Sequence, residues 1–220
     1  MSAQPHAAVL ATEIEPPALR GTLHLVAAVV AAFGALWLVL AADSPTGYVG
    51  GAIFGASLIL LYGTSATYHQ FRWRPSWRRN IRRLDHAMIF VLIAGTYTPF
   101  CLDVSLAWGI PLLVVVWSLA GAGALLKVLW PDAPRWLGVS LYIGLGWVGL
   151  VAVSQVLALY MGSPLALLLL GGVFYMVGGV IYALRRPDPW PRTFGYHEVF
   201  HTLIVAGSAV HYSLIIAYIV

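Results

Sequence analysis

The sequence contains very little charge. Only 9% of its 220 residues are Asp, Glu, Lys or Arg, whereas 60% are hydrophobic and the mean hydropathy is +0.85. A soluble domain typically carries about 25% charged residues, which cover the surface that it turns to water. This chain lacks the charge for such a surface. We therefore expect a protein whose solvent is largely the lipid bilayer.

Cysteine is almost absent, and no cleavable signal peptide is evident. The single Cys101 excludes an internal disulfide and a metal cluster built on several cysteines. The first twenty or so residues contain Glu13, Glu15 and three prolines, without a basic segment followed by an apolar one. We expect residues 1–19 to form a short cytoplasmic tail and residues 20–220 to form a single membrane domain.

Long hydrophobic runs, by contrast, are abundant. A hydrocarbon core about 30 Å thick requires roughly 20 apolar residues per helix. Seven stretches meet this requirement, and proline, glycine, aspartate or arginine lies between them. The stretches are residues 22–42, 48–69, 85–103, 108–129, 136–158, 164–184 and 197–219. The expected fold class is therefore an all-α membrane protein, a bundle of seven transmembrane helices.

The positions of the basic residues support this count and indicate an orientation. With seven spans, all twelve Lys and Arg residues fall on one side, in the N-terminal flank and in the second, fourth and sixth connections. Cytoplasmic segments are enriched in Lys and Arg, so we expect a cytoplasmic N-terminus and an outer C-terminus. We interpret the six arginines of residues 70–84 as a topology signal and not as a nucleic-acid surface.

Several ionisable residues nevertheless lie within or at the ends of the expected spans. An Asp at a helix centre costs roughly 2.5–3.5 kcal/mol to insert, so such residues usually have partners or a function. In the orientation above, these residues lie near the cytoplasmic ends of three helices. They are His69 in the second span, Asp85 and His86 in the third, and His197, Glu198 and His201 in the seventh.

The spacing of these histidines predicts a metal site. His197 and His201 are four residues apart, so they project from one helix face about a turn apart. A third imidazole from His69 would complete a three-histidine set with a fourth position open, as in catalytic zinc sites. Ligand type alone also admits iron, nickel or copper. A histidine pair bonded to lipid headgroups is the alternative. Ser65 shares the helix face of His69.

The other histidines have no functional assignment from the sequence. His24 lies at the cytoplasmic end of the first span, and His6 lies in the tail. His211 lies about 15 Å along the helix from His201, and we interpret it as a packed or hydrogen-bonded residue. His86 points about 100° away from its neighbour Asp85, which favours a supporting or structural role.

Together, these motifs resemble those of the hemolysin III family. They are Ser65-Ala-Thr-Tyr-His69, Asp85 after the arginine-rich stretch, Ile93-Ala-Gly-Thr-Tyr-Thr-Pro99, and His197-Glu-Val-Phe-His201 with His211 beyond it. That family belongs to the wider group of progestin and adipoQ receptors, which includes the adiponectin receptors. The resemblance extends from the second span to the seventh. The short N-terminal segment favours the bacterial branch, and hence a cell-membrane location in a bacterium.

The resemblance implies a zinc ion held by His69, His197 and His201. Asp85 would lie in or next to the ligand sphere, and Ser65 would help to position it. Related receptors are connected with the hydrolysis of lipid amides such as ceramide. The implied function is a hydrolase that acts on a lipid amide or ester at the cytoplasmic edge of the membrane. Asp85 would act as general base or orienting group, with Ser65 as a supporting donor.

Three other functions remain open at this stage. A receptor-like or homeostatic protein would use zinc structurally, without turnover. An intramembrane metalloprotease would use the HExxH string of residues 197–201, with Glu198 as its base. Related receptors carry a non-acidic residue at that position, so we rank the protease lower. A pore-forming hemolysin is disfavoured because the apolar spans contain no polar stripe. The sequence identifies neither the lipid nor the oligomeric state.

Overall fold

The computed structural model describes residues 17–220, which are almost entirely helical. The predicted tail of residues 1–19 therefore lies mostly outside the described part of the chain. The helices, with the short 3₁₀ element η1, run as follows: α1 Thr22–Ala41, α2 Pro45–Gln70, α3 Pro75–Asp103, α4 Leu106–Leu129, α5 Arg135–Trp147, η1 Val148–Ala152, α6 Val153–Tyr160, α7 Ser163–Leu184 and α8 Tyr196–Tyr218.

Seven membrane crossings are confirmed within residues 17–220. Six single helices and the composite segment Arg135–Tyr160 are each long and apolar enough to cross a bilayer. Their ends agree with the predicted spans to within about three residues, except that α3 begins at Pro75, ten residues earlier than expected. Proline suits the first turn of a helix, where its missing N–H has no intrahelical partner. Arginine is also a good helix former, so the basic stretch extends the helix.

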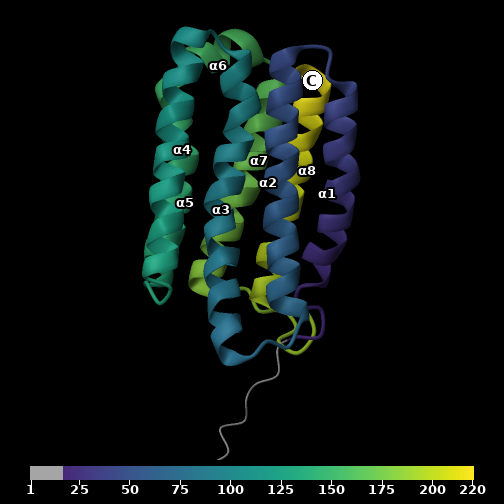
Figure 1. The fold of residues 1–220 in the computed structure, drawn as a ribbon, viewed down its shortest axis with the longest axis vertical. Coiled ribbons are helices and arrows are strands. Elements are labelled where there is room, and N and C mark those ends of the chain that lie inside the picture. The colour runs from purple at the N-terminus through teal and green to yellow at the C-terminus, as the bar shows by residue number, and fades with distance from the viewer. Residues whose placement is uncertain (1–16) are drawn as a thin grey trace, which may run out of the picture.

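The crossings stand side by side, with sequential neighbours in contact (Figure 1). Helix α2 packs between α1 and α3, α3 packs on α4, and α7 packs on α8. The chain also closes on itself, because α1 contacts α8 and α5 contacts α7. The last helix thus lies next to the first, which brings residues from the two ends of the sequence together.

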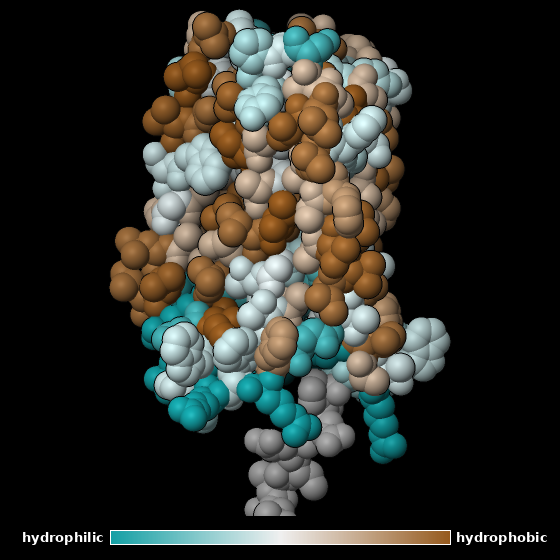
Figure 2. Space-filling view, turned by 45° about the vertical axis from the view of Figure 1, so that its right-hand side comes forward, coloured by the Kyte–Doolittle hydropathy of each residue, from teal (hydrophilic) through white to brown (hydrophobic). Residues whose placement is uncertain are grey.

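One end of the bundle carries the polar surface. The connections α2–α3, α4–α5 and α7–α8 lie at the lower end in Figure 1, opposite the C-terminus. Figure 2 shows hydrophilic side chains gathered at this end, with hydrophobic side chains over most of the surface above it. Large apolar side chains within α1, such as Phe33 and Leu36, are 72% and 56% exposed. Such a surface suits lipid and not water.

Glycine allows close helix contacts inside the bundle. A Cβ at Gly55 of α2 would come within 2.5 Å of the Cβ of Ala35 in α1. A Cβ at Gly123 of α4 would come within 2.3 Å of the ring of Phe90 in α3. Small residues at such contacts let membrane helices approach closely and gain van der Waals packing.

The fifth crossing is interrupted by the 3₁₀ element. Tyr97, on α3, holds this break: its hydroxyl donates to the carbonyl of Gly146 at 2.6 Å and accepts from the N–H of Gly149 at 2.9 Å. Main-chain groups freed by a break inside a membrane need such partners. Tyr97 belongs to the GTYTP motif, and it lines the internal cavity described below together with both glycines.

The orientation remains a prediction, and reporter fusions test it. Alkaline phosphatase fused after Val220 should be active and a fluorescent protein fused there should be dark, because the C-terminus is expected outside. The same reporters inserted in the α4–α5 connection should behave in the opposite way. Active phosphatase in that connection, with a fluorescent C-terminal fusion, would reverse the orientation.

Candidate metal centre

Three histidines from two helices meet at the polar end of the bundle. His69 ends α2, and His197 and His201 lie in the first turns of α8. One ring nitrogen from each lies within 4.8 Å of the others, and the two Nε2 atoms of His69 and His197 are 3.3 Å apart. The predicted grouping of these three side chains is therefore present, although His69 and His197 are 128 residues apart in sequence.

The geometry and chemistry of this triad fit a metal ion. Bonds of about 2.0–2.1 Å from tetrahedral zinc place two ligand nitrogens about 3.3–3.4 Å apart. The Nε2 separation of His69 and His197 has this value. His201 is buried, and the other two are partly buried. Three neutral imidazoles suit zinc, and also iron, nickel or copper. The triad can thus hold a metal ion, whose identity the ligands alone do not determine.

The start of α8 is held by Glu198. Its Oε2 accepts a hydrogen bond from the N–H of Gly195 at 2.8 Å, which closes the first turn of the helix. Its Oε1 accepts from Nε of Arg20, just before α1, in an ion pair. The side chain is only 1% exposed. Glu198 therefore has a structural role here, which argues against its service as the base of an HExxH protease.

His24 also belongs to this site, although its place in the sequence indicated no function. Its ring stacks on that of His201, with centroids 3.7 Å apart and planes within 3°. Its Nδ1 lies 2.8 Å from Oγ of Ser65, and the residue is only 3% exposed. The sequence contained one signal for this role: His24 lies near the same membrane face as the three histidines of the triad.

Gly21 allows α1 to begin directly beside the triad. It has a φ of 82°, a left-handed conformation that glycine adopts without strain. A Cβ at this position would lie 2.5 Å from the Cβ of His69. The amide of Gln70 donates to the carbonyl of Arg20 at 3.2 Å. The turn before α1 is therefore fastened to the end of α2, next to a candidate ligand.

Asp85 lies on α3, and it lines the same cavity as the triad. Its Oδ2 is 3.6 Å from Nδ1 of His86, and its side chain is 13% exposed. His86 donates from Nδ1 to the carbonyl of Arg82 at 2.8 Å, and its Nε2 lies 3.4 Å from the hydroxyl of Tyr182. His86 therefore bridges α3 and α7, which agrees with a structural role. The functions expected for Asp85 and Ser65 stay predictions.

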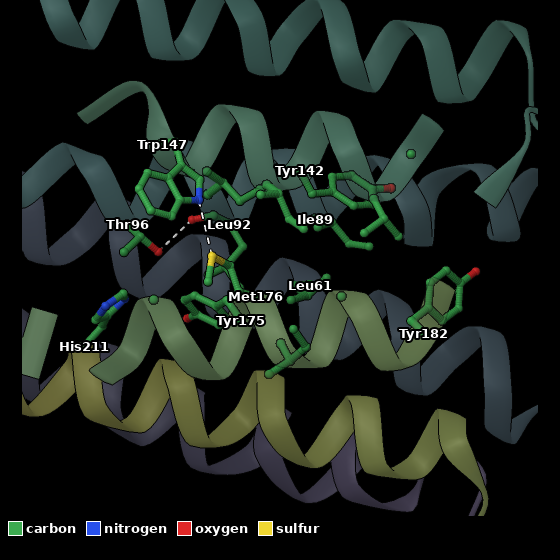
Figure 3. Close-up of a pocket in the computed structure, with 18 of the residues that line it drawn as sticks. Leu61, Ile89, Leu92, Thr96, Tyr142, Trp147, Tyr175, Met176, Tyr182 and His211 are labelled. Carbon is green, nitrogen blue, oxygen red and sulfur yellow. Dashed lines mark hydrogen bonds between the residues drawn. The ribbon is translucent and has the colours of Figure 1, made fainter. Parts of the chain in front are cut away.

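A long cavity of about 1010 Å³ extends from the triad into the bundle. Figure 3 shows Tyr142 and Trp147 of α5 on one side and Tyr175, Met176 and Tyr182 of α7 on the other. The cavity continues as far as Tyr160, near the opposite ends of the helices. Most of its wall is hydrocarbon. The apolar lining includes Ile89, Leu92, Ile93, Ile143, Val173 and Ile204.

Comparison with known proteins agrees with these features. A family model described as haemolysin-III related matches residues 12–212, which is most of the chain. The chain belongs to this family. It is thus a hemolysin III protein with seven crossings and a three-histidine cluster at one end of the bundle.

Named relatives occur in bacteria and in animals. The chain is 35% identical over 169 residues to the hemolysin-3 homolog of Bacillus subtilis (strain 168), covering 76% of each protein. It is 31% identical over 170 residues to hemolysin-3 of Bacillus cereus, covering 76% of the chain and 74% of the relative. The adiponectin receptor protein of Drosophila melanogaster is 27% identical over 180 residues, covering 74% of the chain but only 40% of the receptor.

Metal analysis of variants tests the triad. Purified without chelators, the protein should contain about one metal ion per chain, and His69→Ala and His201→Ala should each lose it, because each removes one of three candidate ligands. His211→Ala, which removes a histidine from the far part of α8, should retain the metal. Elemental analysis of the four proteins measures this. Metal that persists in His69→Ala would show that α2 supplies no ligand.

Proposed function

We propose that this protein is a metal-dependent hydrolase that cleaves an amide or ester bond of a membrane lipid. The observation that carries the proposal is the position of the triad at the polar end of a long apolar cavity. A lipid has the matching shape, since its polar linkage would lie at the histidines and its alkyl chain would fill the space beyond. The resemblance to receptors connected with lipid-amide hydrolysis supports the same substrate class.

Cationic side chains in the cavity wall favour binding of a lipid with an anionic group, or of a carboxylate product. Lys127 and Arg135 line the cavity without a carboxylate partner among the described residues, whereas Arg20 and Arg82, which also line it, are paired with Glu198 and Asp132. Lys127 is only 5% exposed, although α4 otherwise turns mainly apolar side chains outward. A carboxylate released by cleavage of a fatty amide would find these cations close to the bond that broke.

The chemistry is divided between a metal ion and the residues around it. When bound, such an ion supplies Lewis-acid polarisation of the lipid carbonyl and makes water more acidic. Asp85 is the group that would take the proton from the attacking water and return it to the leaving amine or alcohol. Ser65, held by His24, would orient the polar part of the lipid. His24 and Gly21 pack against the triad and restrict the movement of its rings.

The alternatives gain less support. A protease using the HExxH string needs a free Glu198, whereas this carboxylate is bonded to Arg20 and Gly195. A receptor-like protein with structural metal would also need the triad, but it would have no evident use for a cavity that reaches through most of the bundle.

Paired variants test the proposed base. Asp85→Asn should lower hydrolysis of a fluorescent short-chain ceramide by about 10²–10⁴-fold, the usual contribution of a general acid–base group, while the metal is retained. Glu198→Gln should keep activity within a few-fold, with a lower unfolding temperature because the buried ion pair is lost. Release of the labelled acid, metal content and thermal unfolding are measured on the same preparations.

Two results would count against the proposal in different ways. Loss of activity in a folded, metal-containing Glu198→Gln variant, with full activity in Asp85→Asn, would assign the base to Glu198 of the HExxH string and not to Asp85. A fully metal-loaded protein that cleaves neither amide nor ester lipids would favour the receptor-like function.

A further inference from the structure

Part-way along the cavity the apolar wall is interrupted by a mid-cavity polar cluster, formed by Thr96, Tyr175, Ser208 and His211. It joins three helices, α3, α7 and α8. Thr96, Tyr175 and His211 line the cavity, and they lie together at one end of the view in Figure 3, away from Tyr182. The hydroxyl of Ser208 lies 2.8 Å from that of Tyr175 and accepts from that of Tyr62 at 2.6 Å.

Two glycines make room for this cluster in a reciprocal manner. Gly207 of α8 lies opposite the ring of Tyr175 on α7, where a Cβ would come within 2.8 Å of the ring. Gly171 of α7 lies opposite the ring of His211 on α8, where a Cβ would come within 2.3 Å. Each helix therefore lacks a side chain where the other places a polar ring. The α7–α8 contact is built around these two rings.

Two groups of the cluster are left as hydrogen-bond acceptors. Thr96 donates its hydroxyl proton to the carbonyl of Leu92 at 2.8 Å, so its oxygen remains an acceptor. His211 lies 3.1 Å from the carbonyl of Leu168 through Nε2. A carbonyl can only accept, so Nε2 carries the proton and Nδ1 is an acceptor. That Nδ1 is buried and has no hydrogen-bond partner among the described residues. An unpaired buried acceptor is costly, which favours a ligand that can donate.

We infer that the mid-cavity polar cluster is a binding subsite for a hydroxyl group on the alkyl chain of the bound lipid. The inference rests on the proposed function only in placing the polar head of that lipid at the triad. Ser208 follows His201 by seven residues, so the cluster lies about 10 Å farther along the bundle. A neutral hydroxyl suits the cluster because none of its four members carries a fixed charge.

Binding of two fatty acids that differ by a single hydroxyl tests this subsite. In purified full-length protein, 10-hydroxyoctadecanoic acid should displace a fluorescent fatty acid at about 3- to 10-fold lower concentration than octadecanoic acid. This range corresponds to one net hydrogen bond. An extended chain with its carboxylate at the triad places the tenth carbon at about the depth of the cluster. The measurement on the unmodified protein needs no variant to fold.

Two matched tyrosine variants locate the effect. The Tyr175–Ser208 pair uses one of its two hydroxyl protons internally and leaves the other for the oxygen of the lipid hydroxyl. Tyr175→Phe keeps the ring that packs on Gly207 and removes this hydroxyl pair, so the preference should fall below about 2-fold. Tyr182→Phe makes the same change seven residues along α7, in the wall of the same cavity but near the triad. It should leave the ratio between the two acids unchanged, even if the affinity of both shifts.

Other results of the binding measurements overturn the inference. Equal binding of the two acids by the unmodified protein would mean that solvent satisfies the cluster. A preference that survives Tyr175→Phe, or that Tyr182→Phe abolishes, would place hydroxyl recognition elsewhere. Failure of both acids to bind would remove the cavity as a lipid site. Loss of lipid hydrolysis alone, with the hydroxyl preference intact, would overturn the proposed function and leave the subsite in place.

Discussion

The ion pair between Arg20 and Glu198 is the interaction that holds the two ends of the chain together beside the candidate centre. It joins the turn before α1 to the first turn of α8, at the polar end of the bundle. A carboxylate as buried as Glu198 is tolerated only with a charged partner and further hydrogen bonds, and Arg20 and Gly195 provide both. Because α1 is held there, His24 can stack on His201 and Gly21 can pack on His69.

A second constraint, the satisfaction of polar main-chain groups inside the membrane, shapes part of the cavity wall. The fifth crossing breaks at η1, and Tyr97 supplies partners to the main chain of Gly146 and Gly149. Without such partners the break would expose several unpaired groups to hydrocarbon. Tyr97 and these glycines line the cavity, so one tyrosine of the GTYTP motif both stabilises an irregular helix and forms part of the lipid-sized space beside it.

The helix count and the triad were accessible from the sequence for identifiable reasons. Hydrophobic length defines a membrane crossing locally, and the four-residue spacing of His197 and His201 defines a helix face. The third histidine of the triad, His69, was predicted from its depth in the membrane together with the resemblance to the hemolysin III family. The start of α3 was predicted wrongly because arginines at the membrane edge were taken as a loop, although they continue the helix from Pro75.

The amino-acid sequence alone determined membrane insertion, the number of crossings and the end of the bundle at which the ionisable residues gather. These properties depend on the free energy of transferring short segments from water to lipid. Each segment's own residues determine this free energy, independently of the rest of the chain. Only the tertiary structure decided that Glu198 pairs with Arg20 and that His24 stacks on His201. It alone also showed that Gly171 and Gly207 open the α7–α8 contact to polar rings. Those contacts join residues far apart in sequence, and side-chain spacing within one helix carries no information about which helix packs against it.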